Sequence, residues 1–152
     1  MEEMDSGFAR FGFNKMLQQA LNEAGMLQPT DIQLKTLPPS LSGQDILGIA
    51  QTGTGKTAAY LIPLIFHLKY NQIVGPRALI LVPTRELAIQ VEDHFKTLAQ
   101  YTDIKAVALY GGIGPKKQKE QLAEQIDLLI ATPGRLMELY HAGDVVLKKL
   151  KH

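Results

Sequence analysis

The residues best suited to chemistry form one glycine-rich segment, residues 50–57, which reads Ala-Gln-Thr-Gly-Thr-Gly-Lys-Thr. Glycine leaves room for backbone N–H groups to converge on phosphate oxygens. Lys56 is expected to reach the outer phosphates of a nucleotide, and the hydroxyl group of Thr57 is expected to bind Mg²⁺. Ala50 stands where the general pattern has glycine, and a Gly-Lys-Thr triplet alone also arises by chance. The predicted nucleotide contacts are Thr52, Gly53, Thr54, Gly55, Lys56 and Thr57.

Four short apolar segments are expected to form the strands that position this loop. They comprise residues 45–50, 78–82, 106–110 and 127–131. The segments 78–82 and 127–131 are almost continuously apolar, which is typical of parallel strands covered on both faces. The first segment lies directly before the glycine-rich loop, so the loop is predicted to join a strand to a helix. That context argues against a chance match.

Helix-length segments with a different apolar spacing separate these strands. One helix is predicted over residues 15–24, with Asn14 as its N-cap and Gly25 as its stop. A second is predicted over residues 85–101, where apolar residues recur at helical spacing. Two more are expected, one after Gly55 with a bend at Pro63 and a short one from about Gly134 to Gly143. Alternating strands and helices predict an α/β fold with a mostly parallel sheet flanked by helices.

The overall composition limits the classes of function. With 152 residues, of which 45% are hydrophobic, the chain has room for one globular domain. A formal net charge of +1 means that any contact with nucleic acid depends on locally placed groups. The chain has no cysteine, and His67, His94, His141 and His152 lack the spacing of metal ligands. The acidic N-terminus and the short apolar runs predict a cytoplasmic protein without membrane contact.

Several further segments occur in the order found in one protein family. Residues 25–33 resemble the Q motif of DEAD-box RNA helicases, with Phe8 upstream as the isolated aromatic residue, although Met26 replaces an aromatic there. Residues 83–88 resemble motif Ia, Gly111-Gly112 the GG motif, and residues 132–135 motif Ib. Residues 1–152 therefore resemble the N-terminal part of the RecA-like, ATP-binding helicase domain, with the Q motif at 8–33.

The resemblance implies a nucleotide site that prefers adenine and binds ATP or ADP with Mg²⁺. The side-chain amide of Gln33 places an acceptor beside a donor, which complements the edge of adenine. Phe8 would stack on the base, or it could instead anchor the N-terminal arm in the core. Lys56 and Thr57 would be the residues of the catalytic machinery. A P-loop kinase or GTPase is disfavoured, because Gln33 does not match guanine.

The resemblance also implies contacts with the RNA backbone, which carries no sequence information. The residues that would make them are Pro83, Thr84, Arg85, Gly111, Gly112, Thr132, Pro133, Gly134 and Arg135. Each segment follows a predicted strand, and parallel strands end at the same edge of a sheet. Simpler alternatives remain open: an ion pair for Arg85, an ordinary turn at the two glycines, and an ordinary helix cap at Thr132. The basic residues Lys116, Lys117 and Lys119 could add RNA affinity or form a solvated surface.

The family continues with elements that this sequence does not contain. These are a strand ending in Asp-Glu-Ala-Asp, a Ser-Ala-Thr segment and a second RecA-like domain. We therefore expect a truncated domain of an ATP-dependent RNA helicase that unwinds short duplexes, inactive in hydrolysis by itself. A non-catalytic module that binds adenine nucleotides or RNA is the alternative. Loss of neighbouring strands would leave residues 45–50 unpaired, which would lead either to altered strand pairing within one chain or, as we expect, to self-association as a symmetric dimer.

Overall fold

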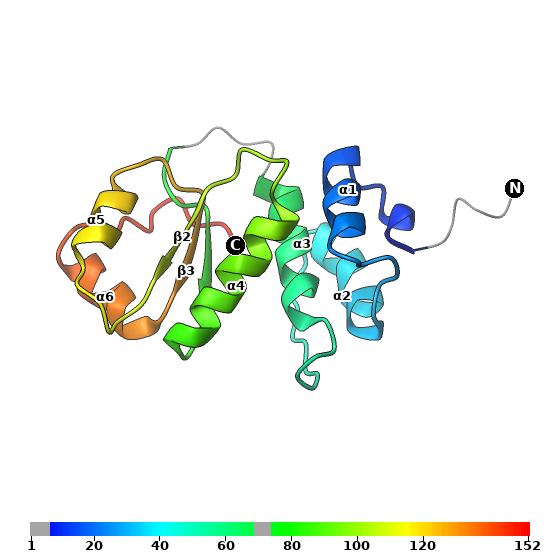
Figure 1. The fold of residues 1–152 in the computed structure, drawn as a ribbon, viewed down its shortest axis with the longest axis horizontal. Coiled ribbons are helices and arrows are strands. Elements are labelled where there is room, and N and C mark those ends of the chain that lie inside the picture. The colour runs from blue at the N-terminus through cyan, green and yellow to red at the C-terminus, as the bar shows by residue number, and fades with distance from the viewer. Residues whose placement is uncertain (1–6, 69–73) are drawn as a thin grey trace, which may run out of the picture. The chain divides into compact units, whose positions relative to one another are not determined.

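The structure is a computed structural model that describes residues 7–68 and 74–152 (Figure 1). The chain divides into two compact units, one with residues 1–69 and 96–103 and the other with residues 70–95 and 104–152. Across the described residues, no helix combines the length and the apolar character needed to cross a membrane.

The first unit is built from helices. It contains the 3₁₀ helix η2 (Gly7–Phe11) and the α-helices α1 (Lys15–Glu23), α2 (Asp31–Leu41) and α3 (Lys56–Leu68). The predicted start and stop of α1 are confirmed, because Asn14 Oδ1 accepts a hydrogen bond from Leu17 N at 2.9 Å and Gly25 has a φ of 75°. Helix α3 follows the glycine-rich loop, as expected, and contains Pro63.

Helix α2 is not among the helices predicted from the sequence. Pro38 and Pro39 lie inside it, and each lacks the N–H group that a helix interior normally uses. The helix begins at a capping box formed by Thr30 and Gln33, and Leu37 is fully buried. Capping and burial therefore outweigh the cost of the two prolines.

The strand predicted at residues 45–50 is wrong. Residues 44–50 have no regular secondary structure, and the side chains of Leu47 and Ile49 are 88% and 86% exposed. A strand exists only where a neighbouring strand takes up its backbone hydrogen bonds. None of the described residues of the first unit lies in a strand, so this segment has no partner there.

The second unit holds the sheet, with strands β1 (Ala78–Leu81), β2 (Ala106–Leu109) and β3 (Leu128–Ala131). All pairings are parallel in the order β1-β3-β2. Helices α4 (Arg85–Leu98), α5 (Lys116–Leu122) and α6 (Pro133–His141) complete the alternation, with the last turn of α4 assigned to the first unit. These strands and helices confirm the predicted α/β fold with a mostly parallel sheet flanked by helices. Strand β3 is buried along its whole length, as its apolar sequence predicted.

A buried ion pair joins the amino-terminal ends of the three strands. Arg77 Nη2 donates to Asp127 Oδ1 at 3.0 Å, and Asp127 Oδ2 accepts a hydrogen bond from Lys105 N at 3.0 Å. Arg77 and Asp127 are 3% and 8% exposed. These contacts connect residues just before β1, β2 and β3, so they hold the sheet together at the end remote from the segments predicted to bind RNA.

Candidate functional site

The glycine-rich loop lies directly before helix α3, at the amino-terminal end of that helix. Gly53 and Gly55 have φ values of 80° and 88°, which are strained for residues with a Cβ atom. The hydroxyl group of Thr54 donates to the carbonyl oxygen of Gln51 and closes the turn. Lys56 is exposed at the first position of α3. Free N–H groups at a helix start and an exposed ammonium group are the features that bind phosphate.

Gln33 connects the start of helix α2 to this loop. Its Oε1 accepts a hydrogen bond from Thr30 N at 3.0 Å, and its Nε2 donates to the carbonyl oxygen of Gly55 at 3.1 Å. A Cβ atom on Gly55 would lie 2.6 Å from Gln33 Nε2 and 2.7 Å from Thr30 Oγ1. Gln33 is only 1% exposed. An amide offers two N–H groups and two lone pairs, so these bonds occupy half of its capacity. The contact with adenine stays a prediction.

Phe8 lies in the aromatic cluster of the N-terminal arm. It is 5% exposed, and its ring centroid is 6.4 Å from that of Phe11. Phe11 stacks on Phe13 at 5.6 Å, and Phe13 lies 6.4 Å from Phe66 on helix α3. This placement fits the alternative in which Phe8 anchors the arm, and stacking on a base stays a prediction.

Thr57, the predicted Mg²⁺ ligand, is half-buried and forms a hydrogen bond with Tyr60 one turn later. Burial raises the pKa of Tyr60, and the hydrogen bond to Thr57 partly opposes that rise. Over residues 7–68 and 74–152, no cluster of three or more histidine, aspartate or glutamate side chains is placed to bind a metal. The prediction for Mg²⁺ therefore depends on Thr57 together with the nucleotide phosphates.

The segments predicted to bind RNA meet at one edge of the sheet in the second unit. Leu81 of β1 and Leu109 of β2 are both in register with Ala131 of β3. The pairing continues beyond the strands, since Val82 N donates to Ala131 O at 3.0 Å and Thr132 N donates to Leu109 O at 2.9 Å. Among the residues predicted to contact RNA, the exposed ones are Pro83, Thr84, Arg85, Gly112, Pro133 and Gly134.

Arg85 follows the outer strand β1, at the start of helix α4, and extends toward the loop after β2. Its guanidinium carbon is 5.4 Å from the centroid of the Tyr110 ring, a cation–π geometry. Gly112 has a φ of 85°, and a Cβ atom there would be 3.0 Å from Arg85 Nη1. The neighbouring Thr84 caps α4, because its hydroxyl oxygen accepts a hydrogen bond from Leu87 N at 3.2 Å. Glycine at position 112 is therefore what allows Arg85 to approach this loop closely.

Arg135, by contrast, directs its side chain into the protein and is 9% exposed. Nη1 donates to Gln118 Oε1 at 3.1 Å, and Nη2 donates to the carbonyl oxygen of Ile113 at 2.8 Å. Nε lies 3.0 Å from Glu138 Oε2, close enough for an ion pair but not aligned as a hydrogen bond. These contacts occupy the guanidinium group and give no support to a contact with RNA. Direct contact of Arg135 with RNA stays a prediction.

Comparison with known proteins identifies the family. The family model described as DEAD/DEAH box helicase matches residues 30–152. The chain belongs to the DEAD/DEAH box helicase family. It is 47% identical over 134 residues to the ATP-dependent RNA helicase DBP10 of Ajellomyces capsulatus, covering 88% of this chain and 15% of that protein. It is 43% identical over 134 residues to the ATP-dependent RNA helicase SrmB of Escherichia coli, covering 86% of this chain and 30% of that protein.

A crystal structure confirms the RecA-like fold of this DEAD/DEAH box helicase domain. The chain superposes on a hypothetical ATP-dependent RNA helicase from Sulfolobus tokodaii with a TM-score of 0.81 and 37% identity, covering 90% of this chain and 39% of that one. These relatives are therefore much longer than the 152 residues of this chain. Membership of the family implies the use of ATP.

One residue of the helicase domain that the motifs did not indicate is Gln118. It is 2% exposed, and its Nε2 donates to the carbonyl oxygen of Tyr110 at 3.0 Å while its Oε1 accepts from Arg135. The only available signal was a neutral amide among the lysines of residues 116–119, and that pattern alone does not indicate burial.

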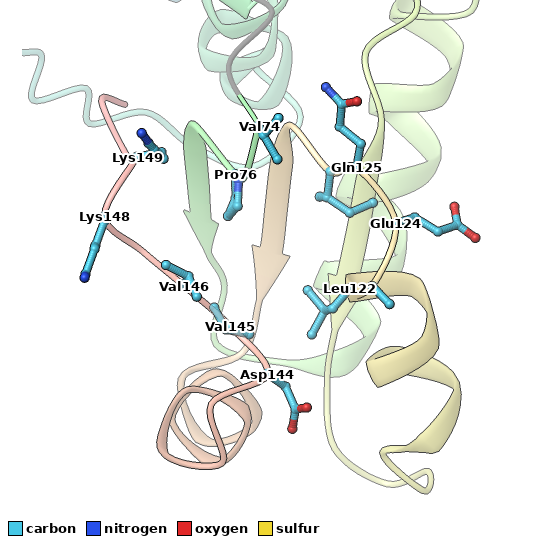
Figure 2. Close-up of a pocket in the computed structure, with 13 residues that line it drawn as sticks. Val74, Pro76, Leu122, Glu124, Gln125, Asp144, Val145, Val146, Lys148 and Lys149 are labelled. Atoms are coloured by element: carbon cyan, nitrogen blue, oxygen red, sulfur yellow. The ribbon is translucent and has the colours of Figure 1, made fainter.

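A groove of about 380 Å³ lies elsewhere in the second unit (Figure 2). Its lining includes residues 74–76 before β1, residues 122–126 before β3, and part of the segment 144–149. It therefore lies toward the amino-terminal ends of the strands, whereas the segments predicted to bind RNA follow their carboxyl ends. The side chains of Glu124 and Gln125 point away from the groove (Figure 2). None of the predicted site residues lines it.

Proposed function

We propose that this domain binds ATP or ADP through residues 52–57 and forms the nucleotide-binding and RNA-binding part of an ATP-dependent RNA helicase. Lys56 would bind the outer phosphates, and Thr57 would bind Mg²⁺. The contact between Gln33 and Gly55 supports this proposal, because it places the residue that would read adenine directly against the phosphate loop. Binding of the base would then be transmitted to the loop through one hydrogen bond.

We place the RNA backbone along the carboxyl ends of β1, β2 and β3. The observation that carries this part is the common register of the three strands, which brings residues 83–85, 111–112 and 132–134 to one edge. Arg85 supplies positive charge there. Gly112 allows close approach of the backbone, and the start of α6 supplies N–H groups for a phosphate. The contacts would be independent of RNA sequence.

Duplex unwinding belongs to the whole protein in this proposal. Hydrolysis needs a group that orients the attacking water and a positive charge that stabilises the transferring phosphoryl group. Lys56 and Thr57 can hold phosphate, but neither activates water. We therefore expect the 152-residue chain to bind nucleotide without useful turnover, in the cytoplasm of its cell.

The exposed segment at residues 44–50 supports self-association of the 152-residue chain. Leu47 and Ile49 are largely exposed, and the backbone around them is not part of a sheet. Pairing of this segment with a second copy would cover apolar surface and take up backbone hydrogen bonds. The expected assembly is a symmetric dimer.

Titration of the purified chain with nucleotides and RNA tests the proposed function. Calorimetry should show that ADP binds more tightly than GDP. Gln33→Ala should reduce that preference, and Lys56→Ala should lower the affinity for both nucleotides. A fluorescent single-stranded uridine oligonucleotide should bind the chain, and Arg85→Gln should weaken that binding and its dependence on salt. Equal affinity for ADP and GDP would contradict the proposal that Gln33 recognises adenine. An RNA affinity that Arg85→Gln leaves unchanged would contradict the proposal that RNA binds along the carboxyl ends of the strands.

A further inference from the structure

The loop at residues 110–113 is held at both ends by side chains from two different helices. Gln118 on α5 donates to the carbonyl oxygen of Tyr110 at 3.0 Å. Arg135 on α6 donates to the carbonyl oxygen of Ile113 at 2.8 Å. Gly111 and Gly112 lie between these two anchored carbonyl groups. The two glycines would otherwise give this loop the greatest backbone freedom on the edge.

Gln118 joins the two anchors into one network. Its amide oxygen accepts from Arg135 Nη1 at 3.1 Å while its amide nitrogen holds Tyr110. It is 2% exposed, so neither bond competes with bulk water. A side chain with an acceptor and a donor at this position is required for both bonds, and a glutamate or an apolar residue would lose at least one of them.

The network extends to Arg85, the exposed cation at the carboxyl ends of the strands. Tyr110 is held through its carbonyl group, and its ring lies 5.4 Å from the guanidinium carbon of Arg85. Gly112, in the middle of the anchored loop, is the residue whose missing Cβ makes room for Arg85 Nη1. A shift of this loop would therefore move both surfaces against which Arg85 lies.

We propose that Gln118 is a positioning residue for RNA binding, which holds the Tyr110–Ile113 loop and through it the side chain of Arg85. The residue contacts no RNA itself in this proposal. Preorganisation lowers the entropic cost of binding. Loss of the network should therefore weaken RNA binding and leave the affinity for nucleotides unchanged. The inference rests on the proposed RNA-binding function of the same edge.

The experiment compares Gln118→Leu and Gln118→Glu with Gln121→Leu, which makes the same apolar change on the same helix. Each 152-residue variant is titrated with the fluorescent uridine oligonucleotide and, separately, with ADP. Hydrogen exchange of residues 110–114 is measured without RNA. Gln118→Glu keeps the size of the side chain and an acceptor for Arg135, and it removes the donor to Tyr110, so it remains informative if Gln118→Leu does not fold.

We expect Gln118→Glu, which loses one hydrogen bond, to bind the oligonucleotide roughly three- to tenfold more weakly, and Gln118→Leu, which loses both, to bind it at least as weakly. Exchange at residues 110–114 should be faster, while ADP affinity should match that of Gln121→Leu. Combining Gln118→Leu with Arg85→Gln should cost less RNA affinity than the sum of the single changes. RNA affinity equal to that of Gln121→Leu, or a parallel loss of ADP affinity, would overturn the inference. If the unaltered chain binds no oligonucleotide, the proposed function fails instead.

Discussion

Replacing Gly55 with alanine tests whether the phosphate loop and Gln33 form one energetic unit. Gly55 has a φ of 88°, and an added Cβ would lie 2.6 Å from Gln33 Nε2 and 2.7 Å from Thr30 Oγ1. Gly53 provides the matched control, since its φ is 80° and a Cβ there would meet nothing within 4 Å. Both substitutions impose the left-handed backbone on alanine, but only Gly55→Ala creates the steric conflict.

The size of each effect follows from these contacts. The left-handed backbone costs a residue with a Cβ about 1–2 kcal/mol, and this is the whole expected effect of Gly53→Ala. Gly55→Ala should add the loss of the bond between Gln33 Nε2 and Gly55 O, which leaves a buried donor unpaired at a cost of about 1–3 kcal/mol. The free energy of unfolding should therefore fall by about 2–5 kcal/mol for Gly55→Ala. Thr30 must also move, so the capping box of α2 is weakened at the same time.

Urea unfolding followed by far-ultraviolet circular dichroism measures the two free energies. The extra cost of Gly55→Ala should become smaller in a Gln33→Ala background, because one of the two conflicting atoms is then absent. ADP affinity should fall further for Gly55→Ala than for Gly53→Ala. If the two glycine variants unfold within about 0.5 kcal/mol of each other, the limit of ordinary additivity, the link between Gln33 and the loop contributes no stability.

Three further predictions concern other parts of the chain. Asp127→Asn should lower the free energy of unfolding by about 3 kcal/mol in urea titrations, because it removes the negative charge that faces the buried Arg77, and an unchanged midpoint would contradict this. Burial lowers the pKa of His94, so the unfolded state binds protons more readily, and stability should fall as pH drops through the ordinary range of histidine titration. His94→Gln should flatten that part of the pH profile of unfolding, and an identical profile would exclude His94 as the cause. Leu47→Lys should make light scattering independent of concentration if the exposed segment 44–50 mediates self-association, whereas an unchanged dimer would place the contact elsewhere.

Local sequence determined most of the second unit and part of the first. The strands β1, β2 and β3 begin and end within a residue of the predicted segments, since each is a short apolar run preceded by a charged residue. The ends of α1 were predictable because Asn14 and Gly25 act on neighbouring backbone groups. Periodicity and capping depend on residues a few positions apart, so the sequence contains their full cause.

Tertiary structure decided the features whose cause lies in distant residues. Residues 45–50 have the apolar character of a strand, but a strand also needs a partner that no local pattern supplies. Helix α2 forms despite Pro38 and Pro39 because burial of Leu37 compensates for the lost hydrogen bonds, whereas its capping box of Thr30 and Gln33 is a local signal. Arg135 and Gln118 show the same difference between sequence and tertiary structure. The residue type determines which hydrogen bonds each side chain can make. Only the fold, by burying both side chains beside the Tyr110–Ile113 loop, determines which of those bonds are made.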